Sequence, residues 1–531
     1  MSAATNIPTV ATAAPPPAAP ATEFRRRVGS ISRQSTVYFG GTLLTAAAGY
    51  FFKIYLARTL GAEALGLYAL GMSIVGAVGL FNAFGLPTAA TRFIAEYSGR
   101  RDYARLGGFL KGGLCLLSAA NLLVALALLR IGPWLGSRFY RAPGLGRYFV
   151  FFAPILLFAV LRNFLEKSMA GYQGVARRTV VTNLIGTPIN ILFAVILISL
   201  GFGLAGYLAA QVASGLLILA MLGFSVWRLT PVSARSAPVS WQLDRTVVSF
   251  SAVALGLAIV HFVLTQADKI ILGFYLDPAQ VGIYAIAMAM VGFIPIALQS
   301  VNQIFSPMIA ELHASRSHEL LRRLYKSLTK WVLILTLPLA LTAMMFSRPL
   351  MGVFGRGFQG GAAVLAIGAV GQIFNCGVGS VGFLLLMSGY EKKLIPIQAA
   401  NAGLVIAVSI MLVPRLGITG AAIAATSAVI ITNLWALAVV VRTLKLFPYD
   451  AAHLRLIVPT ALCGLALFGL RRALLPWHSG WRAGILALIA SYAAFFASLW
   501  MVGLDGEDRK IARIVWNKIS FQSQRIGMGL S

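Results

Sequence analysis

The stretch Lys53–Gly76, KIYLARTLGAEALGLYALGMSIVG, returns 216 positions later as Lys269–Gly292, KIILGFYLDPAQVGIYAIAMAMVG. The identical positions are Lys53/Lys269, Ile54/Ile270, Leu56/Leu272, Leu60/Leu276, Gly66/Gly282, Tyr68/Tyr284, Ala69/Ala285, Met72/Met288, Val75/Val291 and Gly76/Gly292. So many identities at one offset indicate an internal duplication. Each copy is then expected to open one half of a duplicated fold.

The composition around this repeat is that of a membrane protein. Of 531 residues, 59% are hydrophobic and only 11% are charged, and the mean hydropathy is +0.83. About fourteen apolar runs, from residues 36–56 to residues 483–503, are long enough to cross a bilayer as helices. The sequence therefore predicts an all-α polytopic membrane protein with about 14 transmembrane helices, and it excludes a water-soluble domain.

The position of the repeat predicts how these helices are arranged. Six predicted spans separate the two copies, and because six is even, both copies enter the membrane in the same direction. We therefore expect two six-helix lobes related by a pseudo-two-fold axis along the membrane normal, plus a C-terminal helix pair. The expected parts are a disordered cytoplasmic tail (1–34), an N-lobe (35–229), a cytoplasmic linker (230–245), a C-lobe (246–445), the final helix pair (446–504) and a cytoplasmic C-terminal tail (505–531).

Basic residues indicate the orientation of the chain. Most of the 44 Lys and Arg residues fall in segments that share one side of the membrane with both termini. The positive-inside rule then places both termini in the cytoplasm, although four arginines in the outer loop at 130–147 run against it. The net charge of +29 is explained by this topology and by anionic membrane lipids as partners, so it does not imply nucleic acid.

Five phrases point to a family. They are LARTLGAEALGLYAL (from Leu56), AATRFIAEYSGRRD (from Ala89), AGYQGVARR (from Ala170), ADKIILGFYL (from Ala267) and VPRLGITGAAIAATSA (from Val413). In this order they resemble the polysaccharide flippases of the multidrug/oligosaccharidyl-lipid/polysaccharide exporter superfamily. The resemblance implies a monomeric transporter of the bacterial inner membrane that flips undecaprenyl-diphosphate-linked oligosaccharides by alternating access for exopolysaccharide or O-antigen synthesis. It also implies a polysaccharide polymerase and a chain-length regulator as partners.

Other functions remain open at this point. A lipid II flippase is one alternative. Resemblance to those flippases implies two adjacent arginines midway along the second span, where this chain has Val78 and Gly79. It also implies an arginine where this chain has Phe52. A multidrug cation antiporter of the sister family would need carboxylates in its spans, and only Glu166 and Asp268 are placed there. A glycan ligase or polymerase would need a large external loop. The sequence shows no catalytic constellation, no metal-ligand spacing and no phosphate-binding loop, so no enzyme activity and no cofactor are expected.

Charged residues at membrane depth usually face a cavity or each other, which makes them the first site candidates. The expected substrate-binding residues are Lys53, Arg92, Arg162, Lys269, Asn82, Gln266 and Asn302. A structural interpretation stands beside each: the lysines can snorkel to the headgroups, Arg162 can pair with Glu166 one turn on, and Arg92 can anchor at the inner surface. Without an ATP site, Asp268 is the candidate for ion coupling, against a structural pairing with Lys269.

Amide side chains are frequent in the predicted spans and can either join helices or bind a glycan. They are Asn82, Asn121, Asn163, Asn183, Asn190, Gln211, Gln266, Gln299, Asn302, Gln303, Gln372, Asn375, Gln398, Asn401 and Asn433. The three cysteines, Cys115, Cys376 and Cys463, lie in apolar runs and are expected to be packed as free thiols.

Overall fold

The computed structural model describes residues 20–502 apart from residues 141, 239–243 and 475–480. Throughout this part of the chain the regular elements are helices. The N-terminal half contains α1 (Pro20–Asn82), α2 (Leu86–Gly99), α3 (Tyr103–Trp134), η1 (Leu135–Phe139), η2 (Pro143–Tyr148), α4 (Phe149–Gly171), α5 (Val175–Thr179), η3 (Val180–Gly186), α6 (Thr187–Leu197), η4 (Ile198–Phe202), α7 (Gly203–Leu229) and α8 (Val232–Arg235).

The C-terminal half contains α9 (Arg245–Tyr275), α10 (Pro278–Val291), α11 (Ile296–Ala314), α12 (His318–Met345), α13 (Ser347–Gly352), η5 (Arg356–Gly361), α14 (Ala362–Val378), α15 (Val381–Met387), α16 (Glu391–Leu444), α17 (Ala451–Leu454), α18 (Ile457–Leu474) and α19 (Trp481–Val502). The prediction of an all-α, multi-pass membrane protein is confirmed. Helix α1 begins at Pro20, inside the segment 1–34 that was expected to be a tail, and residues 1–19 and 503–531 lie outside the described part.

Within the described residues, ten helices are long and apolar enough to cross a membrane, or eleven if the bent pair α10 and α11 forms one span. The expected number was fourteen, and the difference lies in three long helical stretches that each cover two expected spans. They are broken by glycines with positive φ, at Gly61 in α1, at Gly201 between α6 and α7, and at Gly417 in α16. Only glycine enters this region of φ without strain, so these residues reverse or bend the chain.

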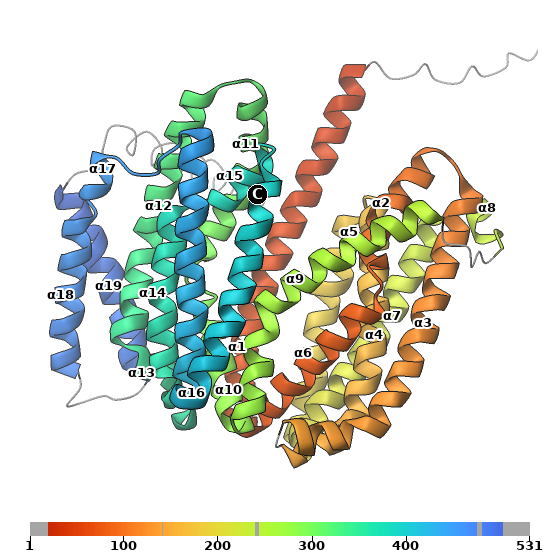
Figure 1. Ribbon diagram of the computed structural model, residues 1–531, viewed down its shortest axis with the longest axis horizontal. Helices are drawn as coiled ribbons and strands as arrows, with labels where there is room; N and C mark the ends of the chain where they lie inside the picture. Colours follow the sequence, from red (N-terminus) through yellow and green to blue (C-terminus); the bar gives the residue numbers. More distant parts are fainter. Residues whose placement is uncertain (1–19, 141, 239–243, 475–480, 503–531) are drawn as a thin grey trace, which may run out of the picture.

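Glycine contacts show that two of these stretches fold back on themselves. A Cβ atom added at Gly420 would lie 2.6 Å from the carbonyl oxygen of Leu412, and one at Gly206 would lie 3.1 Å from the Leu197 carbonyl carbon. Eight residues of uninterrupted helix span about 12 Å. The two arms of α16 therefore pack as a hairpin, as Figure 1 shows, and α6 and α7 do the same.

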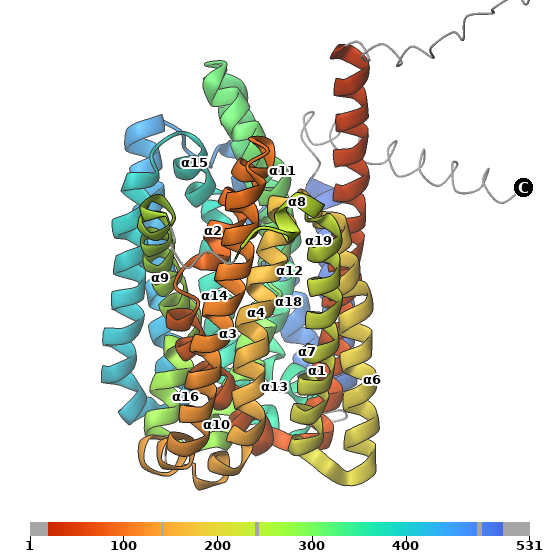
Figure 2. The same cartoon turned by 90° about the vertical axis from the view of Figure 1, so that its right-hand side faces the viewer.

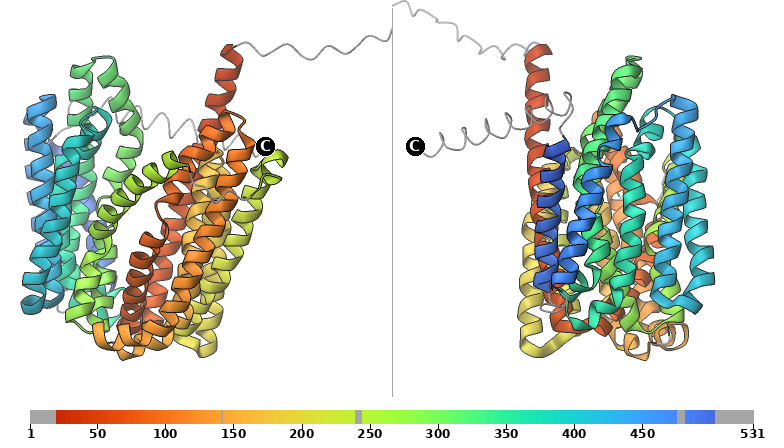
Figure 3. Two further views of the ribbon diagram at one scale, coloured as in Figure 1. Left: turned by 45° about the vertical axis from the view of Figure 1, so that its right-hand side comes forward. Right: turned by 90° about the vertical axis from the view of Figure 1, so that its left-hand side faces the viewer.

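Two helix bundles are visible in Figure 1. One contains α2, α3, α4, α6 and α7, which Figure 2 presents to the viewer; the other contains α11, α12, α14, α16, α18 and α19. They meet at the lower end, where α1 crosses α10, and diverge toward the upper end, where α1 begins. The pair α18 and α19 packs against α12 at the outer side of the second bundle (Figures 1 and 3).

The crossing of α1 and α10 joins the two copies of the repeat. A Cβ atom at Gly66 would overlap the carbonyl oxygen of Pro278, and one at Gly282 would overlap the carbonyl oxygen of Ala62. The offset of 216 residues relates Gly66 to Gly282 and Ala62 to Pro278. The two contacts are therefore equivalent, with the two copies of the repeat exchanged. Such an exchange is the mark of an isologous contact, here formed between two segments of one chain.

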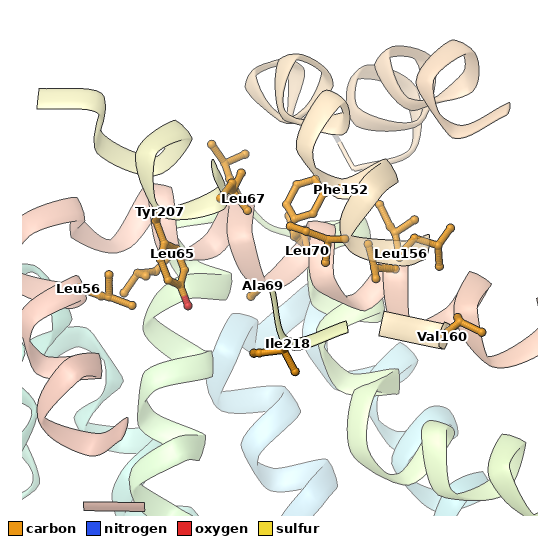
Figure 4. Close-up of a cluster of buried hydrophobic side chains, with 14 of the residues drawn as sticks. Leu56, Leu65, Leu67, Ala69, Leu70, Phe152, Leu156, Val160, Tyr207 and Ile218 are labelled. Atoms are coloured by element: carbon orange, nitrogen blue, oxygen red, sulfur yellow. The ribbon is translucent and has the colours of Figure 1, made fainter. Parts of the chain in front are cut away.

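The core of the N-terminal bundle explains why α1 is held there. Figure 4 shows Leu70 of α1 beside Phe152 and Leu156 of α4, and the side chains of Leu56, Leu65, Tyr207 and Ile218 belong to the same cluster. Phe152 is fully buried, and its ring occupies the space that a side chain at Gly71 would need. In lipid, such close packing rather than water exclusion holds helices together, and small residues allow it.

Candidate substrate cavities and charged residues

A cavity of about 460 Å³ lies between the N-terminal bundle and α9; we call it the α9 cavity. Its walls come from α1, α2 and α4 on one side and from α9 on the other. Its polar lining residues are Thr88, Asn163, His261, Thr265 and Gln266. Since α9 begins the second half of the chain, this cavity lies between the two halves and collects groups from both.

A second cavity, of about 300 Å³, lies inside the N-terminal bundle between α1, α4, the η3–α6 segment and α7; we call it the α7 cavity. Its polar lining residues are Arg162, Thr182, Thr187, Asn190, Gln211 and Ser214. Met72 and Ala159 line both cavities. These two side chains therefore form a shared wall.

Arg162 is one of the expected site residues, and it lines the α7 cavity. Its Nε lies 2.7 Å from Oε1 of Glu166, so the i,i+4 ion pair expected from the sequence is present. The other carboxylate oxygen of Glu166 lies 3.5 Å from Nε of Arg178 in α5. Glu166 thus links two arginines from different helices, and Arg162 reaches the cavity as one member of this triad.

Asp268 and Lys269 form a network at the end of α9. Asp268 Oδ1 lies 3.6 Å from Nζ of Lys269 and accepts a 2.8 Å hydrogen bond from the backbone N–H of the same lysine. Its Oδ2 accepts a 2.9 Å hydrogen bond from the phenol of Tyr284, which is fully buried in α10. Nζ of Lys269 also donates to the carbonyl of Thr265. The aspartate therefore holds α10 against α9.

The two repeat-matched lysines have different surroundings. Lys53 is exposed on α1, and its sequence neighbour is Phe52 where the second copy has Asp268. Within the described residues, neither Lys53 nor Lys269 lines either cavity. The repeat preserves the lysines without preserving their contacts.

Arg92 lies on α2 with its guanidinium 4.8 Å from the ring centre of Phe250 on α9 and 5.3 Å from that of Phe93. It also lies 4.0 Å from Glu96, one turn further along the helix. About half of its side chain is exposed (53%). This arginine thus contacts both halves of the chain at the surface, outside the lining of the two cavities.

Of the three amide residues expected to bind substrate, one lines a cavity and two contact residues outside their own helices. Gln266 lines the α9 cavity. Asn302 accepts a 2.5 Å hydrogen bond from Ser380, at the break between α14 and α15. The backbone carbonyl of Asn82 accepts a 3.4 Å hydrogen bond from Asn121, and the Asn82 amide nitrogen is buried with no hydrogen bond among the described residues. Of these three residues, only Gln266 is among the described residues that line the two cavities.

Sequence reasoning counted Asn163, Asn190 and Gln211 only as span amides and did not select His261, Thr187 or Ser214. The spacing of polar residues in α7 could have indicated two of these cavity residues, Gln211 and Ser214. Tyr207, Gln211 and Ser214 follow an i, i+4, i+7 spacing in α7, which puts them on one helix face. The η3–α6 residues that meet this face are distant in sequence, so their partnership required the fold.

The described residues thus form an all-α, multi-pass membrane protein, with polar side chains in a cavity between its two halves and in another inside the N-terminal bundle. Residues 31–313, more than half of the chain, match the family model described as Polysaccharide biosynthesis protein. The chain therefore belongs to this family. It is 22% identical over 397 residues to "Probable low-salt glycan biosynthesis flippase Agl15" of Haloferax volcanii, covering 74% of this chain and 80% of that protein.

Two solved structures share the fold. "Lipid II flippase MurJ, inward closed conformation" matches 87% of this chain and 98% of its own with a TM-score of 0.68 at 15% identity. An inward-facing multidrug resistance MATE family transporter of the MOP superfamily matches 75% of this chain and 94% of its own, with a TM-score of 0.60 at 16% identity. The chain thus shares the fold of these two transporters.

Proposed function

We propose that the protein translocates undecaprenyl-diphosphate-linked oligosaccharide units across the cytoplasmic membrane by alternating access, for the synthesis of an exopolysaccharide or O-antigen. The observation that carries this proposal is the α9 cavity, a volume with five polar lining residues between the two halves of a chain that belongs to the polysaccharide biosynthesis family. The name of the Haloferax relative, a probable flippase of glycan biosynthesis, supports the same substrate class.

Physical chemistry gives such a molecule a clear task. Transferring one hydroxyl from water to an apolar medium without a hydrogen bond costs several kcal/mol, and an oligosaccharide carries many hydroxyls. The α9 cavity offers amides, hydroxyls and an imidazole to this head group, from Asn163, Gln266, Thr88 and His261. The polyprenyl chain can stay in lipid throughout.

The proposed architecture has fourteen crossings. Dividing α1, the α6–α7 stretch and α16 at their glycines raises the eleven candidate spans by three. We propose that spans one to six and seven to twelve form two lobes related by a pseudo-two-fold axis along the membrane normal, with α18 and α19 added outside. The exchanged contacts of Gly66 and Gly282 support this relation.

We propose that the diverging, upper end in Figure 1 faces the cytoplasm, together with both termini. The segments at this end include the α2–α3 turn with Arg100 and Arg101, and α8 with Arg235. Basic residues concentrate on the cytoplasmic side of membrane proteins and attract anionic lipids. In this orientation the protein is closed on the outer side at the α1–α10 crossing.

The geometry supports a proposed role for each expected site residue. Gln266 is proposed as a head-group contact in the α9 cavity, and Arg162 as a polar contact in the α7 cavity. Lys53, Arg92 and Lys269 are proposed to act on the diphosphate as it approaches or leaves, since their positive charges lie outside both cavities. Asn82 and Asn302 are proposed to position helices, through Asn121 and Ser380.

We propose that transport is driven either by consumption of product at the outer surface, by a polymerase working with a chain-length regulator, or by an ion gradient that Asp268 senses. The hydrogen bonds of Asp268 to Lys269 and Tyr284 join α9 to α10. Protonation of its carboxylate would weaken both contacts. Coupling and helix positioning would therefore use the same atoms.

The test is transport in proteoliposomes that contain the full-length protein. The probe is a fluorescent polyprenyl-diphosphate-linked oligosaccharide, and the readout is the initial rate at which its sugar becomes accessible on the opposite leaflet. Gln266→Leu should lower this rate, whereas Gln299→Leu, at an exposed amide outside both cavities, should not. Transport of lipid II or of a drug cation with no transport of the oligosaccharide would refute the proposal.

The same assay separates the coupling models. A pH or Na⁺ gradient should change the initial rate if Asp268 is coupled to transport, and Asp268→Asn should abolish that change. Unaltered rates in both gradients would leave consumption of product as the driving process. Replacing Lys53 and Lys269 together by Gln should slow transport without lowering the amount of protein in the membrane, and an unchanged rate would assign both lysines to the headgroup region.

A further inference from the structure

The α7 cavity is separate from the space between the two halves. It lies wholly within the N-terminal bundle, and only the Met72 and Ala159 wall divides it from the α9 cavity. Its volume is about 300 Å³. A methionine side chain has three rotatable bonds and adapts its shape readily. A group in the α9 cavity could therefore pass Met72 into the α7 cavity.

The polar groups of the α7 cavity are able both to donate and to accept hydrogen bonds. Asn190 donates a 2.8 Å hydrogen bond to the hydroxyl of Ser214, and Gln211 donates a 2.9 Å hydrogen bond to the phenol of Tyr68. Each of these bonds uses one of the two amide hydrogens, and the amide oxygen takes no part in the bond. A ligand that both donates and accepts, such as a hydroxyl-bearing ring, matches these groups better than an ion of either sign.

The charge of the cavity also favours a neutral ligand. Arg162 is its only charged lining residue among those described, and Glu166, which lies 2.7 Å away and also contacts Arg178, offsets part of that charge. Its terminal guanidinium nitrogens still supply donors. The ring of Phe158 lines the same volume and offers an apolar face. Donors, acceptors and one apolar face together suit a sugar ring, which has hydroxyls at its edge and C–H groups on its faces.

The polar residues that α7 contributes to the α7 cavity have no counterparts in the corresponding helix of the C-terminal half. The phrases GLAG from Gly203 and GITG from Gly417 align α7 with the second arm of α16. In this register Gln211 and Ser214 correspond to Ala425 and Ala428. The opposite wall includes η3, a π-helical segment, and such segments are frequent at functional sites. The two polar groups that α7 contributes to the cavity are therefore absent from the repeat.

We infer that the α7 cavity is a saccharide subsite, which holds one sugar ring of the lipid-linked oligosaccharide while the diphosphate remains between the two halves. The inference rests on the proposed function and assigns its sugar-recognition step to a volume inside one lobe. Recognition of the glycan would then depend on α4, α6 and α7. The approach and departure of the diphosphate would depend on the residues outside the cavities.

Protection of single cysteines from a water-soluble thiol reagent tests this subsite in the full-length protein. Thr187→Cys and Gly215→Cys place thiols in the α7 cavity; a Cβ at Gly215 meets only Phe158, at 3.5 Å, so it should fit. Asn163→Cys places one in the α9 cavity, and Ser199→Cys is an exposed control. Cys115 is exposed, contrary to the expectation of packed thiols, and is replaced by Ser, whereas Cys376 and Cys463 are buried as expected.

Three probes distinguish the outcomes: a polyprenyl-diphosphate-linked trisaccharide, the sugar-free polyprenyl diphosphate and the free trisaccharide. At twice its dissociation constant, a bound ligand should slow modification about threefold. We expect the lipid-linked trisaccharide to protect the thiols at 163, 187 and 215, and the sugar-free lipid to protect only that at 163. Protection by the free trisaccharide at 187 and 215 would show that the ring alone suffices.

Protection at 163 without protection at 187 or 215 would overturn the subsite and leave the proposed function standing. Absence of protection at all three positions would instead refute the proposed function. Protection of Ser199→Cys would indicate a nonspecific effect of lipid on the reagent and would also count against the subsite. If Thr187→Cys fails to fold, Gly215→Cys gives the same information from the opposite wall.

Discussion

A methyl group at Gly282 should force apart the two helices that close one end of the molecule. In Gly282→Ala the added Cβ would overlap the carbonyl oxygen of Ala62 and lie 2.8 Å from the backbone nitrogen of Gly66. Both obstacles are backbone atoms, which cannot rotate away as a side chain can. Either α10 must move from α1, or the conformation that contains this contact must lose population.

The size of the effect follows from the type of clash. Inserting a methyl group into a tightly packed contact costs about 1–3 kcal/mol. Because 1.4 kcal/mol corresponds to a tenfold change in an equilibrium constant, the closed contact should lose stability relative to an open one by a factor of about 5 to 150. Gly66→Ala should behave alike, since its Cβ would meet Pro278. The double variant should show less than the sum of the two effects, because both act on one contact.

Spin labels on either side of the contact would measure the change. Glu63 and Gln280 are exposed and flank the crossing on α1 and α10, so cysteines there, with Cys115 replaced by Ser, report the distance between the helices. We expect Gly282→Ala to shift the distribution to longer distances. Gly256→Ala is the matched control, because a Cβ there meets no atom within 4 Å. An unchanged distribution in both Gly66→Ala and Gly282→Ala would refute the reasoning.

Three further substitutions test the charged networks. Tyr284→Phe removes the phenol that donates to Asp268 and should lower the stability of the detergent-solubilised protein by about 1.5–3 kcal/mol in thermal unfolding, and an unchanged melting temperature would contradict a role in joining α9 to α10. Glu166→Gln should destabilise the protein by less than the roughly 3–5 kcal/mol of a fully buried pair, because the Arg162 side chain is 40% exposed. Arg162→Gln should cost less still, since Glu166 keeps its contact with Arg178, and the reverse order would contradict the triad.

The class of protein was readable from local composition. A hydrocarbon core of fixed thickness demands apolar runs of fixed length, and the backbone must satisfy its own hydrogen bonds there, so apolar runs of this length predict membrane helices without knowledge of their neighbours. The repeat of Lys53–Gly76 at Lys269–Gly292 likewise predicted a duplicated fold. The Arg162–Glu166 pair was predictable because an i,i+4 spacing fixes the distance between two side chains on one helix.

The site residues stay a prediction. Arg162 and Gln266 line the α7 and α9 cavities, whereas the other expected residues lie outside the lining of both: Lys53, Arg92, Lys269, Asn82 and Asn302. Sequence spacing gives the depth of a residue along its helix but not the direction in which that helix faces. A rotation of half a turn moves a side chain from a cavity to lipid or to a neighbouring helix, and the contacts between helices decide it.

By itself, then, the sequence determined the all-α membrane class, the duplication and the family, because each depends on the order of residues along the chain. Tertiary structure alone decided that Asn190 meets Ser214, that Gln211 meets Tyr68 and that the two repeats touch at Gly66 and Gly282. These contacts join segments that are far apart in sequence, and they depend on how closely two helices approach. In lipid that approach is set by the fit of small residues and large side chains, which no single helix contains.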